Sequence, residues 1–411
     1  MKTFLSPLTI QEEKQYLKQL GEGSLEAKHI LMDACMVPVE NAKEAALVKG
    51  IRLFGVNTLE EVIKGFNDEI KFWEPEKEEI GHEKKVKRKE VPDFSEINGQ
   101  QFVKRACEIA VSGRHNLLMI GPPGAGKTMI ARRIPGILPE MTEEEALEVT
   151  KIYSVRGLLT ESEAWMAERP FRNPHHTITP QGLAGGGMVP GPGEISLAHH
   201  GVLFLDELAE FRRETLEILR QPMEEHCVKL ARLAGNYEFP SDFMLVAAMN
   251  PCRCGYYPDL NRCHCTKGMV EQYLKKISQP LLDRIDICVE TKRVEYQDLI
   301  KENPHQETSA EIRKRVVAAM ERQQQRFAGT NIRYNSRIPA ALLTKYCRLS
   351  TKQKQYMENI YQKLELTARS YHRILRVART IADMDGSDEI LTRHLSEAVC
   401  YRNVDKKFWE G

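Results

Sequence analysis

A glycine-rich segment of eight residues constrains the fold of this chain more than any other feature. It reads GPPGAGKT at residues 121–128, and the apolar run NLLMI at residues 116–120 leads directly into it. A glycine-rich turn between a buried strand and a helix lets successive backbone N–H groups point inward at phosphate oxygens, and the dipole of the following helix adds positive potential. The sequence therefore predicts a nucleotide-phosphate site on a parallel sheet.

Each position of this segment has an expected role. The loop of Gly121, Pro122, Pro123, Gly124, Ala125 and Gly126 would surround the β- and γ-phosphates of ATP, and its non-proline N–H groups would donate to them. Lys127 would reach the β- and γ-oxygens, and the hydroxyl of Thr128 would hold Mg²⁺. A chance glycine loop is the alternative, and the strand and helix patterns on either side argue against it.

A second apolar run, GVLFL at residues 201–205, ends in the two carboxylates Asp206 and Glu207. Asp206 at the strand tip would bind Mg²⁺ through water, and Glu207 would polarise the attacking water. Two solvated acids at a strand end are the plainer alternative, but the loop at residues 121–128 favours hydrolysis. Together the two patterns predict an ATPase that uses ATP and Mg²⁺.

Two further polar residues fit the same site. Asn250 follows the apolar run FMLVAAM at residues 243–249, where its amide could orient the lytic water. Arg284, in LLDRID, comes just past a predicted helix and could reach the nucleotide of a neighbouring subunit. Each could instead be an ordinary polar loop residue or ion-pair partner. Their order along the chain favours the active-site interpretation.

Alternating apolar runs and helical stretches predict an α/β core with a parallel sheet flanked by helices over residues 93–292. Beyond about residue 293 the patterns are helical, which predicts a connecting region at 293–330 and a helical lid at 331–411. Ser350 and Gln353 form a capping-box pattern in that lid.

The N-terminal part has a different composition. Residues 1–35 and 36–72 carry helical patterns, with a capping-box pattern at Thr9 and Glu12. Residues 73–92 are almost purely charged and predict a solvated linker. The basic block at residues 84–89 could contact nucleic acid, although a solvated run is the more usual interpretation.

Charge and apolar content exclude several classes. The formal net charge of +1 gives no global field, so nucleic-acid binding would depend on local basic patches. No apolar run approaches the roughly eighteen residues that a membrane span needs. The N-terminus MKTFLSPLTIQEEKQ is too acidic and too briefly apolar for a signal peptide. We expect a cytoplasmic protein without membrane contact, whose ten cysteines are thiols or metal ligands.

Four of the cysteines, Cys252, Cys254, Cys263 and Cys265, lie within fourteen residues as two C-x-C pairs. Two thiolate pairs separated by a turn could close a tetrahedral, structural Zn²⁺ site. C-x-C is tighter than the commoner C-x₂-C spacing, and four reduced thiols in a loop are the alternative. The histidine pairs 175–176 and 199–200 more often satisfy backbone groups than bind metal.

Five longer segments carry a family resemblance. They are RNPHHTITPQGLAGGG (172–187), PGEISLAHHGVLFLDELAEF (192–211), MNPCRCGYY (249–257), PLLDRIDICVE (280–290) and ARSYHRILRVARTIADMDG (368–386). With the loop at 121–128, they resemble the ComM/YifB family of magnesium chelatase-like AAA+ ATPases over residues 93–402. The resemblance implies an AAA+ core with an all-helical lid and a ring, expected to be a hexamer.

The resemblance also implies functions and residue roles. Members of the family are similar to a DNA branch-migration helicase of natural transformation and recombination. Asn250 takes the role called sensor one, Arg284 that of the finger acting in trans, and Arg369 that of the lid arginine called sensor two, with Arg376 as the fallback. The alternatives are a magnesium-chelatase motor subunit and a nucleotide-switched regulatory assembly without DNA translocation.

Two segments look like insertions that could meet single-stranded or branched DNA. Residues 171–200 are rich in Gly, Pro and His, and the resemblance suggests that they project towards the pore of the ring. Residues 226–243 alternate like a hairpin that carries Lys229 and Arg232, with Arg220 upstream. Cations on such a hairpin would track phosphates without reading bases. Surface ion pairs on a solvated hairpin are the alternative.

The N-terminal region carries two weaker resemblances. Residues 36–67 resemble the last helix–strand–helix of the Lon-like domain with which family members begin, and residues 7–33 resemble the opening helices of sporulation-type sigma factors. The resemblance implies either a fusion or a truncated, rearranged family member, without the region that would hold a Ser/Lys protease dyad.

Overall fold

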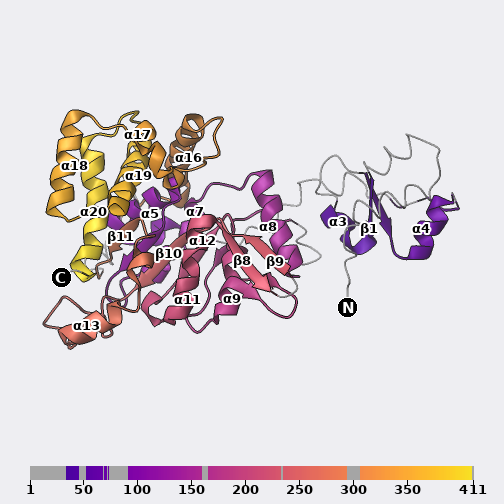
Figure 1. Ribbon diagram of the computed structural model, residues 1–411, viewed down its shortest axis with the longest axis horizontal. Helices are drawn as coiled ribbons and strands as arrows, with labels where there is room; N and C mark the ends of the chain where they lie inside the picture. The colour runs from indigo at the N-terminus through magenta and orange to yellow at the C-terminus, as the bar shows by residue number, and fades with distance from the viewer. Residues whose placement is uncertain are drawn as a thin grey trace. The chain divides into compact units, whose positions relative to one another are not determined.

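The computed structural model describes residues 34–45, 52–67, 69–71, 73, 91–159, 165–232, 235–293 and 306–409 (Figure 1). The chain forms two compact units, residues 1–86 and 87–411. The predictions for the capping box at Thr9, the sigma-factor-like helices at 7–33 and the basic block at 84–89 lie outside the described residues.

The first unit contains a small parallel sheet. Its elements are β1 (Ala34–Pro38), a 3₁₀ turn (Val39–Asn41), α3 (Ala42–Ala45), β2 (Arg52–Val56) and α4 (Leu59–Phe66). β1 pairs with β2 from Ala34 opposite Arg52 to Pro38 opposite Val56. The order expected for residues 36–67 is present as α3–β2–α4. The structure adds β1, whose backbone groups pair with those of β2.

The second unit is built on a five-stranded sheet in the order β11-β3-β10-β7-β4, with every neighbouring pair parallel. The strands are β3 (Leu117–Ile120), β4 (Phe171–Arg172), β7 (Val202–Leu205), β10 (Met244–Met249) and β11 (Ile287–Glu290). Three of them, β3, β7 and β10, are the apolar runs that the sequence identified. The short strands β4 and β11 complete the two edges of the sheet.

Side chains alternate between the two faces of this sheet, and both faces are buried. Leu117 and Met119 of β3 join one apolar cluster, whereas Leu118 and Ile120 join the other. All four are fully buried. Continuous apolar runs of this kind are typical of strands covered by helices on both sides, so the predicted α/β fold is confirmed.

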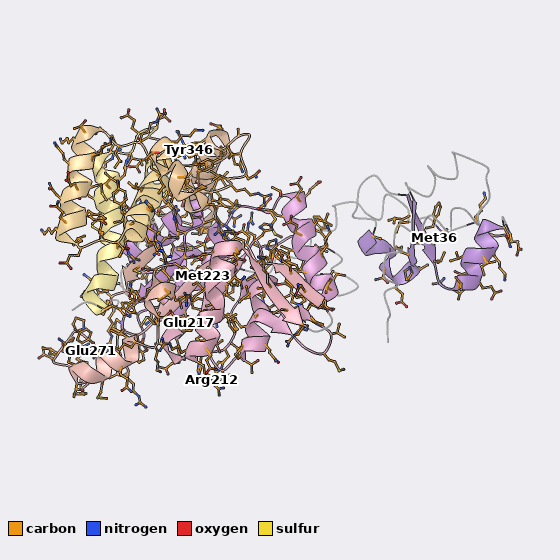
Figure 2. All side chains as sticks on the ribbon, viewed as in Figure 1. Met36, Arg212, Glu217, Met223, Glu271 and Tyr346 are labelled. Atoms are coloured by element: carbon orange, nitrogen blue, oxygen red, sulfur yellow. The ribbon has the colours of Figure 1, made fainter. Side chains whose placement is uncertain are left out.

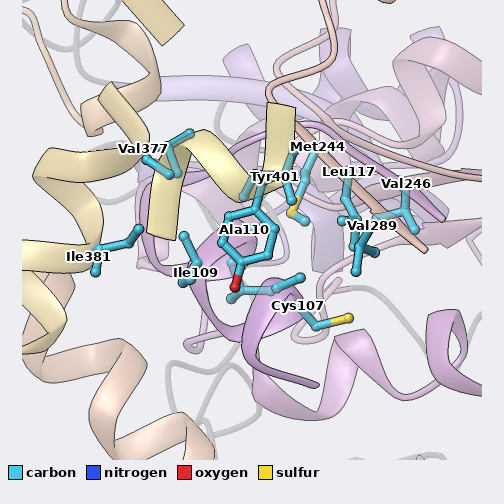
Figure 3. Packing of buried hydrophobic residues seen from close by; sticks show 14 of the residues in the cluster. Cys107, Ile109, Ala110, Leu117, Met244, Val246, Val289, Val377, Ile381 and Tyr401 are labelled. Atoms are coloured by element: carbon cyan, nitrogen blue, oxygen red, sulfur yellow. The ribbon is translucent and has the colours of Figure 1, made fainter. Parts of the chain in front are cut away.

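On one face the sheet shares a continuous core with helices from both ends of the unit. Cys107, Ile109 and Ala110 come from the helix that precedes β3, and Val377, Ile381 and Tyr401 come from the C-terminal helices (Figure 3). These elements are α5 (Gln101–Gly113), α16 (Ser309–Arg326), α19 (Ala368–Met384) and α20 (Thr392–Trp409). The C-terminal helices are therefore packed through the same core as the strands of the sheet.

The opposite face is covered by short helices and a hairpin. Met223 is buried in this layer, whereas Arg212 and Glu271 are exposed on its margin (Figure 2).

The remaining helices of the unit, which lie on either face, are α6 (Lys127–Ala131), α7 (Ile134–Ile137), α8 (Glu143–Val155), α9 (Pro180–Ala184), α10 (Glu194–Leu197), α11 (Arg213–Glu217), α12 (Pro222–Glu225), α13 (Lys267–Leu274), α14 (Gln279–Leu282), α17 (Leu343–Tyr346) and α18 (Thr351–Lys363). Two antiparallel pairs accompany them, β5 (Gly185–Gly186) with β6 (Gly191–Pro192) and β8 (Cys227–Arg232) with β9 (Gly235–Pro240).

The C-terminal region is helical throughout its described part, in which no strand follows Glu290. α18 begins with the expected capping box, because the Ser350 N–H donates to Gln353 Oε1 at 2.7 Å. Within the part of the chain that the structure describes, no helix is long and apolar enough to cross a membrane.

Candidate nucleotide site

Parallel pairing brings three loops to one edge of the sheet. β3 lies next to β10, and β10 lies next to β7, so the carboxyl ends of these strands meet. Ligands of open α/β sheets bind at this edge. A cavity of about 420 Å³ opens here, within the size range of ligand sites. It is lined by Pro123, Gly124, Ala125, Gly126, Lys127, Thr128, Met129, Asp206, Glu207, Met249 and Asn250.

The backbone of the loop requires its glycines. Gly124 and Gly126 have φ values of +75° and +79°, which L side chains rarely adopt. Gly121 is needed for a different reason, because a Cβ there would lie 2.1 Å from Thr291 Oγ1. The chain can thus turn sharply between β3 and α6.

Lys127 points back into the loop. Its Nζ donates to the carbonyl oxygens of Gly121 and Pro122 at 2.7 and 2.9 Å and to Asn250 Oδ1 at 3.1 Å. Burial lowers the pKa of Lys127 to about 8, with Asp206 and Glu207 acting in the opposite direction. Burial removes water from the Lys127 ammonium group. A bound triphosphate would compensate for this, since its oxygens are strong hydrogen-bond acceptors.

Thr128 and Asp206 form the part of the site suited to a metal. Thr128 Oγ1 donates to Asp206 Oδ2 at 2.6 Å, and Asp206 Oδ1 accepts the N–H of Glu207 at 3.0 Å. A hydroxyl and a carboxylate this close are hard oxygen donors of the type Mg²⁺ prefers, so these residues fit the expected ion.

Glu207 has a neighbour that the sequence did not reveal. Its φ of +52° is uncommon for a residue other than glycine, and its Oε2 lies 3.3 Å from His176 Nδ1. The rings of His175 and His176 are 4.1 Å apart. His176 stands thirty-one positions before Glu207 in the sequence, and only its place in a histidine pair drew attention to it.

Two of the expected arginines lie elsewhere. Arg284 pairs with Glu224 at 2.5 Å and also donates to the Arg220 carbonyl at 3.1 Å. Arg369 is exposed at the start of α19, and Arg376 donates to the Ile338 carbonyl at 2.9 Å. Neither Arg284 nor Arg369 is among the described residues that line the cavity. Their roles at a nucleotide remain predictions.

The second expected insertion is a hairpin, as its alternation predicted. β8 and β9 pair from Cys227 opposite Pro240 to Arg232 opposite Gly235. Lys229 forms an ion pair with Glu225 at 2.8 Å, which matches the alternative of a surface ion pair, and Arg220 pairs likewise with Glu217. Arg232 is exposed near the turn, and no ion pair of it occurs among the described residues.

The histidine pair 199–200 satisfies neighbouring groups. His199 Nδ1 accepts the N–H of Asp242 at 2.9 Å, and the Nε2 atoms of both histidines lie within 3.0 Å of Glu148 Oε2. Burial lowers the pKa of His199 to about 4, so the ring is neutral at pH 7. The bond to the Asp242 backbone matches the structural interpretation of the pair, and the ligand atoms of Glu148, His199 and His200 also lie within 4.8 Å of one another.

The four clustered cysteines meet in space. Their Sγ atoms all lie within 4.8 Å of one another, in the loop between β10 and α13. The sequence grouped these four residues correctly, but the separation of nine positions between Cys254 and Cys263 did not by itself show that the two pairs face each other.

Comparisons with known proteins agree with this architecture. Residues 93–299 match the family described as "Magnesium chelatase, subunit ChlI", and residues 306–402 match "Magnesium chelatase, subunit ChlI C-terminal". The chain is 41% identical to Competence protein ComM of Haemophilus influenzae over 369 residues, covering 89% of this chain and 71% of ComM. It is 45% identical to YifB of Escherichia coli over 314 residues, covering 76% of this chain and 61% of YifB.

The similarity to a chelatase subunit is weaker. The chain is 27% identical over 162 residues to the magnesium-chelatase 67 kDa subunit of Chlorobaculum parvum. That alignment covers 38% of this chain and 23% of the subunit.

Proposed function

The chain belongs to the ComM/YifB family of magnesium chelatase-like AAA+ ATPases, and from this premise we propose that it is a ring-forming motor that couples ATP hydrolysis to movement along single-stranded or branched DNA. The observation that carries the ATPase part is the meeting of Lys127, Thr128, Asp206, Glu207 and Asn250 at one cavity. The DNA part rests on the family and on the β8–β9 hairpin.

The residues of the cavity divide the chemistry of hydrolysis between them. The loop N–H groups and Lys127 hold the β- and γ-phosphates and stabilise the charge that develops on the leaving oxygen. Thr128 and Asp206 would hold Mg²⁺, which would supply positive charge against the phosphates. Glu207 accepts the proton of the attacking water, and Asn250 orients that water.

Within this scheme His176 is a positioning residue for Glu207. Its ring nitrogen lies 3.3 Å from the carboxylate, so it can hold Glu207 in one orientation when no water is engaged. Lys127 and Asn250 are already in contact at 3.1 Å. Binding of a γ-phosphate between them would exchange this hydrogen bond for contacts to substrate oxygens.

The two insertions offer a contact surface for DNA. A Cβ placed on Gly186, in the β5–β6 pair, would lie 3.3 Å from Arg232 Nη2, so the two antiparallel pairs are adjacent. Met188 and Val189 at the β5–β6 turn are 102% and 84% exposed. An exposed guanidinium beside apolar side chains can follow a phosphate backbone without reading sequence.

A magnesium-chelatase motor is the second candidate, because the matching family is described by that name. The identity to ComM is higher and covers 89% of the chain, against 38% for the chelatase subunit. The branch-migration type is therefore the better supported of the two. A regulator without translocation would hydrolyse ATP at a rate independent of DNA.

The test is ATP hydrolysis by the full chain with and without single-stranded and forked DNA. We expect stimulation by DNA, its loss in Glu207→Gln, and its retention in Glu210→Gln, an exposed acid three residues away that does not line the cavity. Arg232→Ala should reduce the stimulation and its salt dependence, whereas Lys354→Ala on α18 should not. Hydrolysis indifferent to DNA would refute the motor proposal and leave the ATPase intact.

A mixing experiment tests the ring and the role of Arg284. Glu207→Gln and Arg284→Ala should each be inactive alone, because one lacks the base and the other the finger. If Arg284 acts on a neighbouring site, mixed rings contain sites with an intact Glu207 and an intact neighbouring Arg284, and about a quarter of the activity returns at equal amounts. No recovery would indicate that Arg284 serves only its own subunit through Glu224.

A further inference from the structure

The cluster of Cys252, Cys254, Cys263 and Cys265 lies outside the nucleotide chemistry described so far. Its Sγ atoms are 3.4 Å apart between Cys252 and Cys254, 3.8 Å between Cys252 and Cys263, and 3.5 Å between Cys254 and Cys263. All four lie within 4.8 Å of one another, and all four are free thiols. Tetrahedral Zn²⁺ with Zn–S bonds of about 2.3 Å places its sulfurs about 3.8 Å apart.

Backbone donors surround these sulfurs. The Tyr257 N–H donates to Cys252 Sγ at 3.4 Å. Backbone N–H groups of Tyr256 and His264 are directed at the Cys254 sulfur, and that of Cys265 is directed at the Cys263 sulfur. Donors around the ligands orient them and stabilise negative charge on thiolates, as in other metal sites.

The composition of the loop also suits a charged cluster. Four thiolates around one Zn²⁺ carry a net charge of −2, and the cations near the cysteines are Arg253 and Arg262 in the loop and Lys267 at the start of α13. His264 is exposed and is not part of the group whose ligand atoms converge. Four sulfurs and no nitrogen select zinc or iron over magnesium or calcium.

The cluster adjoins the phosphate loop. Cys252 follows Asn250 by two residues, at the end of β10. Gly255, with a φ of +87°, packs so closely on the loop that a Cβ there would lie 2.5 Å from Pro123 Cδ. The segment that carries the cysteines therefore contacts Pro123 of the phosphate loop. It also follows closely on Asn250, which accepts a hydrogen bond from Lys127.

We propose that these four cysteines bind one structural Zn²⁺, and that the metal braces the end of β10 against the phosphate loop so that its loss weakens ATP binding. All four ligand positions are filled by protein, so the ion takes no part in hydrolysis. The effect on ATP binding rests on the proposed nucleotide site, and neither part requires movement along DNA.

The first test is the metal content of the full chain purified in reductant, measured by mass spectrometry. We expect one zinc per chain, and less than about a tenth of that in Cys263→Ser/Cys265→Ser. The control Cys35→Ser/Cys400→Ser removes two exposed thiols outside the cluster and should keep the full content. Cys265→His supplies another zinc ligand and should keep most of it.

Cobalt keeps the test decisive if a cysteine variant fails to fold. Co²⁺ added to the metal-stripped, reduced wild-type chain should give the absorption of a tetrahedral thiolate complex, and one equivalent of Zn²⁺ should remove it. Iron in place of zinc, two disulfides, or four reactive thiols without bound metal would each overturn the proposal.

The bracing is tested separately from the metal. Gly255→Ala should retain its zinc but raise the dissociation constant for Mg-ATP by about tenfold, because its Cβ would lie 2.5 Å from Pro123 Cδ and would displace the phosphate loop. Stripping zinc from the wild-type chain should shift the constant in the same direction. Unchanged ATP binding in the stripped protein would refute the brace even if zinc is present.

Discussion

Thr128→Ala tests whether Thr128 and Asp206 form the Mg²⁺ site of the nucleotide cavity. The Thr128 hydroxyl donates to Asp206 Oδ2 at 2.6 Å in a partly buried position. A hydrogen bond to a charged group contributes about 1.5–3 kcal/mol, which corresponds to a factor of about 10 to 150 in an equilibrium constant. Removal of the hydroxyl would also take away the side-chain oxygen that is expected to hold Mg²⁺ directly.

We expect the dissociation constant for Mg-ATP to rise by about 10- to 100-fold in this variant. The affinity for ATP without magnesium, measured in EDTA, should change less than about threefold, because Lys127 and the loop N–H groups hold the phosphates directly. Thr128→Ser keeps the hydroxyl and serves as the control. Isothermal titration with and without Mg²⁺ provides both constants.

An equal loss of affinity with and without magnesium would refute this reasoning. It would mean that Thr128 acts by shaping the start of α6 and not by holding the metal. A loss in Thr128→Ser as large as that in Thr128→Ala would lead to the same conclusion.

Three further predictions concern stability. Asp383 is buried and accepts hydrogen bonds from Arg326, Arg379 and Asn335. Asp383→Ala should therefore lower the free energy of unfolding, measured in urea, by about 3–5 kcal/mol, and a loss below about 1 kcal/mol would contradict the prediction. Burial lowers the pKa of His199 and of His226 to about 4, below the ordinary 6.5. Between pH 4 and 6.5 the unfolded chain therefore binds more protons than the folded chain. The free energy of unfolding should fall by up to about 3 kcal/mol per histidine as the pH drops from 6.5 to 4. A melting temperature that does not change with pH in this window would contradict the prediction. Gly121→Ala should abolish ATP binding and lower the melting temperature because its Cβ would meet Thr291, whereas Gly268→Ala, with open space around it, should do neither.

Much of the nucleotide site could be predicted from the sequence because its parts are local. The loop at 121–128 is expected to bind phosphates through backbone N–H groups that lie within its own eight residues. Asp206 and Glu207 follow directly on a buried strand. The hairpin at 227–240 and the capping box at Ser350 depend equally on neighbours in the sequence.

Contacts between distant residues could not be predicted in this way. The sequence did not show that β10 lies between β3 and β7, and this order is what places Asn250 against Lys127. Nor did it show that His176 faces Glu207 or that Arg284 is held by Glu224. The contacts of Asn250 and His176 depend on how strands pair across the sheet, whereas Arg284 follows α14 and Glu224 lies on α12.

The sequence by itself determined the α/β class and the helical C-terminal region and predicted the phosphate loop, because backbone turns and apolar periodicity act over a few residues. Only the tertiary structure decided which polar groups meet. Cys254 and Cys263, nine positions apart, come within 3.5 Å, and Gly255 packs on Pro123 from more than a hundred positions away. The contact of Gly255 with Pro123 depends on strands that are far apart in the sequence, because the order of β3, β10 and β7 in the buried sheet decides which loops are neighbours.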